Sequence, residues 1–419
     1  MSSCVITPVL MKDDVLVFHV KNGKGLLRIR FGSQEDKEAG NGGFLALVFD
    51  DVPLIRFHGD AYFCPTCEKL VSAGYGRDKC TDNSLRAAGD SLNGTFESIE
   101  KCFDSLKLLL GLLPDGYYAL SDEEVFPTDG NGNFFWSVNN TATLNRASCP
   151  VYENDNGDFR WSVPDPKYLL PTQPPRLFNA ERVAFYRGRD DARALAVSME
   201  GYLCALLDGH HKATAAALDG RPIRTIMIHM TPVRWCDGDK AGGIELAGVF
   251  VPGGGLPYRP EIYDDTWKDG RLQGNDIERY LSCREESFDD YPWPKEILDT
   301  ARAYPDVRML AFIEWAGNDL SDERLKRIVT GREADENARY VVNALFASND
   351  ARRIAFAVGI CRNRAYVHLW HNVFLLLASA GSREVEDFFI DYLINDDGVR
   401  PDITRIVDDY FRKMPGKSS

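Results

Sequence analysis

Apolar and polar positions alternate over short stretches in the N-terminal third of the chain. Val15–Val20, Gly25–Phe31 and Phe44–Phe49 are apolar or alternating runs of strand length, and turns rich in glycine and asparagine separate them. Residues 96–113 instead carry apolar side chains at the three- and four-residue spacing of an amphipathic helix. The pattern therefore predicts a β-rich domain with one helix over residues 1–150.

A proline-rich segment follows and marks a predicted domain boundary. Residues 151–175 contain prolines at positions 164, 166, 171, 174 and 175. Because proline fixes φ and lacks an N–H donor, this density favours extended backbone that pairs poorly. We expect a linker here and a central α/β domain over residues 176–290, in which Arg182–Tyr186 form a strand and Asp190–Met199 a helix.

The clearest pattern in the central domain is a strand, a tight turn, a helix and a second strand. Tyr202–Leu207 is an apolar run of strand length, and Asp208-Gly209 interrupts it. Lys212–Leu218 is rich in alanine and favours a helix, and the β-branched run Ile223–Ile228 fits a buried strand. This order places the residues after Gly209 at a helix N-terminus.

From about residue 291 the pattern becomes helical. Successive stretches each carry an apolar face and end at a polar break, and helix pairs of this length resemble HEAT-like solenoid repeats. We expect a helical domain over residues 291–414 and a tail over 415–419, so that the whole chain has an α+β fold. The predicted helices are Trp293–Tyr304, Asp322–Thr330, Glu333–Ala347, Ala351–Arg362, Ala365–Ala380, Ser382–Ile394 and Pro401–Met414.

Composition and charge restrict the classes of function. Apolar residues make up 44% of the 419 residues, as in soluble globular proteins, and no stretch approaches the roughly 20 apolar residues of a membrane span. The formal net charge of −14 disfavours nucleic acid as a general partner, because pairing between cations and phosphates drives such binding. The N-terminus shows no secretory signal, so the ten cysteines are expected to be thiols of a cytoplasmic protein.

The predicted helix N-terminus carries three basic side chains, His210, His211 and Lys212. Free backbone N–H groups and the positive end of the helix dipole favour a bound anion at such a position. Three basic groups there are costly unless negative charge neutralises them, and a phosphate is the candidate. A second interpretation stays open, in which the two histidines cap a turn that is exposed to water.

Residues 208–220 resemble the signature loop of the ParB/sulfiredoxin superfamily, and the resemblance extends roughly over Leu177–Thr231. In that family a Gly-x-[His/Arg]-[Arg/Lys]-x-x-Ala turn opens a helix and holds the phosphates of a nucleotide. Gly209 matches the family glycine, and His211 and Lys212 match the basic pair. The resemblance therefore implies that Gly209, the histidines and Lys212 contact nucleotide phosphates.

One departure separates the chain from the sulfiredoxins, because His210 occupies the position of their catalytic cysteine. The loop is closer to that of the small-molecule kinases, such as the free serine kinases. The resemblance implies a phosphotransferase that uses ATP or ADP with Mg²⁺ and acts on a small hydroxylated substrate. Asp208, Glu181 and Glu200 are the candidate metal ligands or bases, since phosphoryl transfer needs a carboxylate near the acceptor hydroxyl. Lys212, expected at an exposed helix start, should bind phosphate without supporting the fold.

Two other functions stay open from the sequence. The same domain could bind a nucleotide without turnover, as a sensor whose C-terminal helices contact a protein partner. It could also be a scaffold in which the phosphate loop is vestigial. Nucleotide binding without turnover would distinguish the sensor, and the absence of nucleotide binding would distinguish the scaffold.

A Cys-x-x-Cys turn in the N-terminal region is a candidate metal site. Cys64 and Cys67 can present two thiolates to one Zn²⁺, and His58 and Cys80 are the nearest candidates for the two further ligands of a tetrahedral site. A redox pair is one alternative, because Cys-Pro-x-Cys before a helix resembles the glutaredoxin motif. Two unpaired thiols in a turn are the third interpretation.

Overall fold

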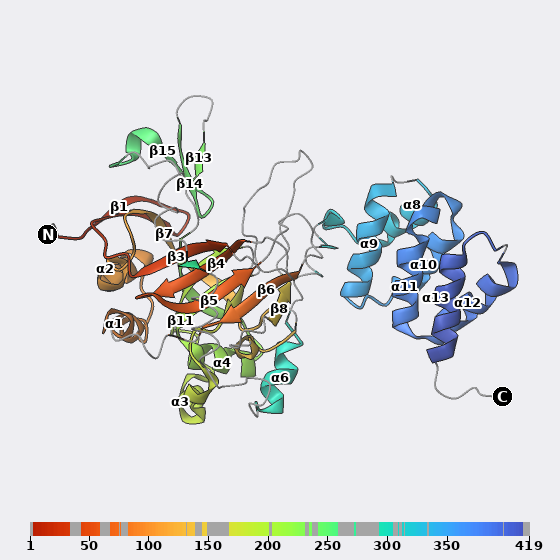
Figure 1. Cartoon of the computed structure of the whole chain (residues 1–419), viewed down its shortest axis with the longest axis horizontal. Helices are drawn as coiled ribbons and strands as arrows, with labels where there is room; N and C mark the ends of the chain where they lie inside the picture. Colours follow the sequence, from red (N-terminus) through yellow and green to blue (C-terminus); the bar gives the residue numbers. More distant parts are fainter. Residues whose placement is uncertain are drawn as a thin grey trace. The chain divides into compact units, whose positions relative to one another are not determined.

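The structure is a computed structural model of the chain, which forms two compact units, Met1–Val307 and Arg308–Ser419 (Figure 1). We call them the first and the second unit. Within the described ranges no helix combines the length and the apolar character that a membrane span requires. The described residues are 3–33, 43–58, 68–74, 76, 83–130, 132–138, 145–148, 167–200, 203–230, 234–236, 242–258, 272–273, 293–304, 309, 312–313, 315–332, 335–396 and 398–413.

The first unit is built on a seven-stranded mixed sheet with the strand order β1-β2-β7-β12-β10-β11-β9. The last strand of this order, β9, also pairs with β7, so that β7, β12, β10, β11 and β9 form a closed ring of paired strands. The strands are β1 (Val5–Lys12), β2 (Val15–Lys21), β7 (Gly116–Phe126), β9 (Lys167–Leu170), β10 (Ala194–Glu200), β11 (Leu203–Asp208) and β12 (Ile223–His229).

This sheet joins segments that the sequence pattern assigns to separate domains. β7, from the predicted N-terminal domain, pairs along its length with β12 of the predicted central domain. β9 lies inside the predicted linker, yet all four of its residues are buried. The boundary expected over residues 151–175 is therefore wrong, because the apolar residues between the prolines form a core strand instead of a solvated connection.

Two further sheets belong to the first unit. The three predicted strands of the N-terminal third are confirmed as β2, β3 and β4. A six-stranded sheet has the order β16-β3-β4-β5-β6-β8, and a three-stranded sheet has the order β13-β14-β15. Their strands are β3 (Leu27–Ser33), β4 (Gly43–Phe49), β5 (Val52–His58), β6 (Glu68–Ala73), β8 (Asn145–Ser148), β13 (Arg234–Cys236), β14 (Gly243–Leu246), β15 (Val249–Pro252) and β16 (Leu272–Gln273).

Two helices of the N-terminal region pack against each other. The predicted helix over residues 96–113 is confirmed as α2 (Ile99–Leu110), and the Ser98 side chain caps it by accepting a hydrogen bond from the backbone N–H of Lys101 at 3.3 Å. The apolar face of α2 is buried, as its spacing predicts. α1 (Asn83–Ser91) is a helix for which the apolar pattern predicts no element, and it buries Leu85.

The strand, turn, helix and strand predicted around residue 209 are confirmed as β11, α4 (His210–Leu218) and β12. The two elements before them are reversed from the prediction, since Ala180–Tyr186 form a helix, α3, and Ala194–Glu200 form β10. Asn179 starts α3 by accepting a hydrogen bond from the backbone N–H of Arg182 at 3.0 Å. β10 is a strand because it pairs with β11 on one side and β12 on the other.

The last described helix of the first unit is α6 (Lys295–Ala301), which packs against α4. This helix falls in the region 291–414 that the sequence pattern assigns to the C-terminal domain, so the change from the first to the second unit comes later than predicted, after Val307. The short 3₁₀ helices are η2 (Phe135–Ser137), η3 (Pro175–Leu177), η4 (Gly253–Gly255) and, in the second unit, η5 (Arg364–Leu369).

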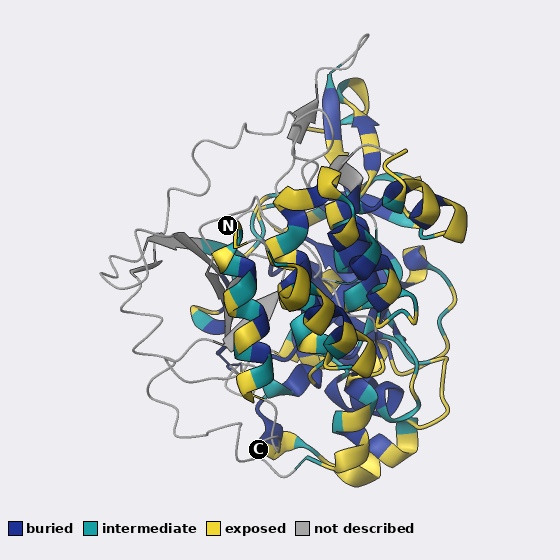
Figure 2. Cartoon of the chain, turned by 90° about the vertical axis from the view of Figure 1, so that its right-hand side faces the viewer, coloured by how far each residue is buried: buried dark blue, intermediate teal, exposed yellow. Residues whose placement is uncertain are grey.

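The second unit is helical, as predicted, and the chain therefore has a mixed α+β fold. Its helices bury one side around Tyr366, Phe374 and Phe389, and Figure 2 shows buried and exposed residues on opposite sides of single helices. Whether the helices form HEAT-like repeats stays a prediction. They are α8 (Asp322–Val329), α9 (Asp335–Ala347), α10 (Arg353–Arg362), α11 (Trp370–Ala380), α12 (Arg383–Asn395) and α13 (Pro401–Lys413).

Candidate functional site

A cavity of about 560 Å³ lies at the N-terminus of α4 in the first unit. Three parts of the chain line it: α1 with the turn after it, the segment from Gln173 through α3, and the turn from β11 into α4. Its volume falls within the range of roughly 300–1,000 Å³ that is typical of small-molecule sites. The lining residues are Asn83, Arg86, Gly89, Asp90, Asn93, Gln173, Arg182, Tyr186, Asp208, Gly209, His210, His211 and Lys212.

Gly209 forms the sharp turn from β11 into α4. Its φ of 100° lies in the left-handed region that favours glycine, and a Cβ at this position would lie 2.9 Å from the Cβ of Ala194. The first hydrogen bond of the helix runs from the Ala213 N–H to the Gly209 carbonyl at 2.8 Å. The N–H groups of the first turn of α4 have no carbonyl partner within their own helix, and the residues that carry them, His210, His211 and Lys212, line the cavity.

Lys212 is buried, with only 5% of its surface exposed, which corrects the expectation of an exposed helix start. Its ammonium group donates hydrogen bonds to the carbonyl of Arg193 at 2.7 Å and to that of Leu92 at 3.3 Å. Burial lowers the pKa of Lys212, while the nearby carboxylate of Asp208 opposes this shift. Lys212 therefore ties the start of β10 and the end of α1 to α4, in addition to lining the cavity.

His210 is also buried, and its ring holds the segment before α3. Its Nε2 accepts hydrogen bonds from the backbone N–H groups of Thr172 at 3.0 Å and Gln173 at 3.2 Å. A nitrogen that accepts two hydrogen bonds carries no proton, so the ring proton lies on Nδ1. The interpretation in which the histidines cap a water-exposed turn is therefore wrong for His210.

His211 makes a similar contact and is neutral near pH 7. Its Nε2 lies 3.0 Å from the backbone N of Asn179 and 3.0 Å from the carbonyl oxygen of Leu177. Burial, followed by the charge of Arg182, lowers the pKa of His211 to about 4. The lowered pKa disfavours the charged form of the imidazole, so we expect the phosphate contacts predicted for His211 to come mainly from other residues.

Besides Lys212, α1 and α3 each contribute a cationic side chain to the cavity. Arg86 and Arg182 both line it, and neither guanidinium forms an ion pair with a residue of the described ranges. The sequence pattern missed Arg86 because the apolar positions predict no helix there. A signal was nevertheless present, since the polar residues Asn83, Arg86, Asp90 and Asn93 recur at the spacing of one helical face.

Two carboxylates face the same cavity, those of Asp208 and Asp90. A Cβ placed on Gly89 would lie 2.7 Å from the carboxylate carbon of Asp208, so the glycine in α1 keeps room for this group. Glu181 is exposed in the first turn of α3 and does not line the cavity. Glu200 ends β10, and its side chain lies outside the described residues.

The two carboxylates of the cavity suit a Mg²⁺ ion that also binds the phosphates of a ligand. Mg²⁺ is usually bound by one or two carboxylates plus substrate phosphates and water, and not by a cage of protein ligands. Asp208 and Asp90 supply two carboxylates, and Gly89 leaves the space beside the first of them open. Among the described residues no group of three or more histidine, cysteine or acidic side chains could hold a metal by itself.

The side chains of the predicted zinc site lie outside the part of the chain that the structure describes. Cys64, Cys67 and Cys80 lie outside the described residues, and so does the side chain of His58 at the end of β5. The zinc, redox and unpaired-thiol interpretations of this turn stay predictions.

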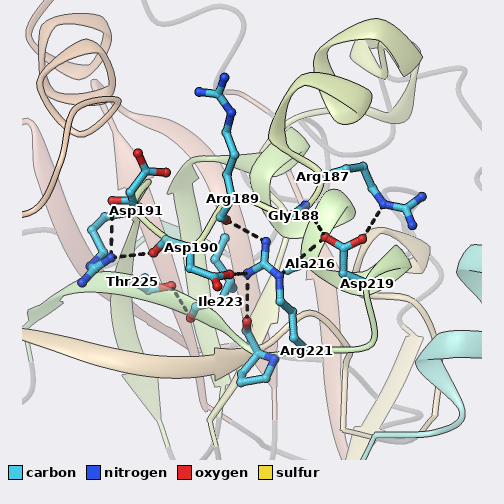
Figure 3. A network of polar contacts seen from close by, with 12 residues as sticks. Arg187, Gly188, Arg189, Asp190, Asp191, Ala216, Asp219, Arg221, Ile223 and Thr225 are labelled. Atoms are coloured by element: carbon cyan, nitrogen blue, oxygen red, sulfur yellow. Dashed lines mark hydrogen bonds and ion pairs between the residues drawn. The ribbon is translucent and has the colours of Figure 1, made fainter.

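A polar network fixes the loop after α3 against the C-terminal end of α4 (Figure 3). The Asp219 carboxylate accepts hydrogen bonds from the Arg187 side chain and from the Gly188 backbone N–H, the latter at 2.8 Å. Burial opposes ionisation of Asp219, but these hydrogen bonds outweigh it and lower the pKa. Arg221 donates to the Arg189 carbonyl at 2.8 Å. The network therefore fixes the far end of α3, the helix that presents Arg182 to the cavity.

The chain was compared with protein-family models, with curated proteins and with solved structures, and none of them matches it.

Proposed function

We propose that the cavity at the N-terminus of α4 binds the phosphates of a nucleotide, and that the protein is an ATP- or ADP-dependent phosphotransferase acting on a small hydroxylated substrate. One observation carries this proposal. Arg86 and Arg182, which make no ion pair within the described ranges, line a cavity of about 560 Å³ together with the first turn of α4. Two such arginines and a helix N-terminus are complementary to a polyanion.

The positive and negative groups of the cavity would have different roles in such a reaction. Arg86, Arg182 and the N–H groups of α4 would bind the phosphate oxygens, where the negative charge lies. Asp208 and Asp90 would hold Mg²⁺, which supplies further neutralisation of the phosphates. The carboxylate of Asp208 would also orient the acceptor hydroxyl and accept its proton when the phosphoryl group is transferred.

The local architecture supports the resemblance to the ParB/sulfiredoxin superfamily. A glycine with positive φ follows β11 and opens α4, which is the arrangement that the signature loop implies. The resemblance needs one revision in detail, because Lys212 is buried against two carbonyls and His211 is neutral. We assign the phosphate contacts mainly to Arg86, Arg182 and the backbone of α4.

The test is isothermal titration of the full chain with ATP, ADP and CTP in the presence of Mg²⁺. We expect saturable binding that weakens roughly 10- to 100-fold in Arg86→Ala and Arg182→Ala, since a charge-assisted hydrogen bond contributes about 1.5–3 kcal/mol. Arg302→Ala is the matched control, because this arginine is exposed on the same unit and does not line the cavity. Absence of binding to all three nucleotides would refute the proposal.

A second candidate function, binding of a protein partner by the C-terminal helices, rests on one surface of α12. Ile390 and Ile394 are 46% and 76% exposed, and they alternate with the exposed acidic residues Asp387 and Asp391 on one face. An amphipathic segment with basic and apolar positions would complement this face. We expect a labelled synthetic helix of leucine and lysine to bind the unmodified full chain, measured by fluorescence anisotropy, and to bind Ile394→Asp more weakly. Equal affinity for the unmodified chain and for Ile394→Asp would refute this function.

A further inference from the structure

Beside the cavity, α3 exposes an aromatic side chain that the phosphate contacts do not use. Phe185 is 56% exposed, and the guanidinium of Arg189 lies over its ring at 3.9 Å from the centroid. An exposed phenylalanine of this size leaves apolar surface in water, which is unfavourable by about 25 cal/mol per Å². Among the described residues Arg189 forms no ion pair, and its guanidinium contacts the Phe185 ring.

The pair is connected to the cavity through Tyr186. The Phe185 and Tyr186 rings lie with their centroids 5.1 Å apart at an interplanar angle of 81°, and Tyr186 lines the cavity. The ammonium group of Lys212 lies 5.7 Å from the centre of the Tyr186 ring. Lys212, Tyr186 and Phe185 are therefore linked by successive contacts, from the cavity lining to the exposed ring.

The position of Arg189 is fixed from its backbone. Arg221 donates a hydrogen bond to the Arg189 carbonyl at 2.8 Å, and in Figure 3 the Arg189 side chain points away from the network that holds its main chain. Tyr186 is held in a similar way, since its hydroxyl donates to the Asn93 side chain at 3.2 Å. The planar groups are therefore presented on a supported backbone, which lowers the entropy lost when a ligand binds.

We propose that Phe185 and Arg189 form the platform on which the base of the bound nucleotide stacks, an inference that rests on the proposed function. In a nucleotide the ribose separates the base from the phosphates, so a base platform must lie beside the phosphate site and not within it. Phe185 meets this condition, because its neighbour on α3 lines the cavity and it does not. Aromatic rings and arginine planes are the groups on which proteins stack bases.

The experiment compares two ligands, ATP and inorganic tripolyphosphate, in titrations of the full chain with Mg²⁺. Tripolyphosphate carries the phosphates but no base, so its affinity reports on the phosphate contacts without any contribution from stacking. In Phe185→Ala we expect ATP affinity to fall roughly tenfold, since stacking of a base on an aromatic ring contributes about 1–3 kcal/mol. The affinity of Phe185→Ala for tripolyphosphate should remain that of the unmodified chain. In Phe185→Trp, which keeps an aromatic ring, the affinity for ATP should also be that of the unmodified chain.

Phe250→Ala is the matched control, because Phe250 is a half-exposed phenylalanine of the same unit on β15, at 39% exposure, and is expected to change neither affinity. Unchanged ATP affinity in Phe185→Ala would overturn the platform while leaving the phosphate site intact. An equal loss for ATP and tripolyphosphate would also overturn it, since the effect would not involve the base. Failure of the unmodified chain to bind either ligand would refute the proposed function, and the platform with it.

Discussion

Replacement of Lys212 by alanine separates the structural from the ligand-binding residues of the cavity. The family resemblance predicts that this change removes nucleotide binding and leaves the fold intact. The structure predicts a loss of stability as well, because the ammonium group bonds the carbonyls of Arg193 and Leu92 in the interior of the first unit.

The magnitude follows from the two carbonyls that lose their donor. A buried polar group left without a hydrogen bond costs about 1–3 kcal/mol, so the two together predict a loss of about 2–6 kcal/mol in the free energy of unfolding. Lys212 is 5% exposed, so water cannot readily replace the missing donor. The Arg193 carbonyl, at the shorter distance of 2.7 Å, should account for the larger share.

Hydrogen exchange by mass spectrometry measures this loss locally, because peptides from α4 and β10 report the opening of the elements that Lys212 connects. Arg86→Ala is the contrasting variant, since Arg86 is exposed on α1 and should lower nucleotide affinity without changing protection of α4. A change of less than about 0.5 kcal/mol in Lys212→Ala, the size expected for a surface substitution, would refute the structural role.

Three further changes test other parts of the cavity. In the folded chain the pKa of His211 is lowered to about 4 from its usual 6.5, so the unfolded chain binds the proton first, and stability should fall as the pH drops from 6.5 towards 4. Urea titrations at several pH values give the free energy of unfolding, which should depend less steeply on pH in His211→Gln. An unchanged pH dependence would contradict the assignment. Gly209→Ala should destabilise the unit by about 1–3 kcal/mol in thermal unfolding, because the position has positive φ and lies against Ala194. Gly89→Ala should displace the Asp208 carboxylate and weaken Mg²⁺-dependent nucleotide binding, although alanine favours the helix by about 1 kcal/mol; unchanged affinity would show that Asp208 does not hold the metal.

The local sequence pattern was sufficient to predict those helices and strands whose apolar residues recur at one regular spacing. α2 was predictable because its apolar residues recur every three or four positions, and the turn at Gly209 because glycine follows an apolar strand and precedes an alanine-rich helix. The helices of the second unit were predictable for the same reason. These features depend on interactions between residues that are close in the chain, so the local sequence pattern is sufficient to predict them.

Local patterns failed where a distant segment decided the conformation. Residues 194–200 are a strand because β11 and β12 flank them, and β9 is a strand because it closes the ring between β11 and β7. Neither set of partners can be read from the residues themselves. For the same reason the expected linker became part of the core.

The candidate site shows the same division. The residue pattern alone was enough to predict that a glycine turn after Asp208 opens a helix with Lys212 in its first turn. Three further features follow from contacts between distant segments. Lys212 is buried against two carbonyls, burial lowers the pKa of His211, and Arg86 and Arg182 line the cavity. The physical reason is that burial and charge pairing depend on which segments meet in space. Lys212 of α4, for example, bonds the carbonyl of Leu92, which lies 120 residues earlier in the chain.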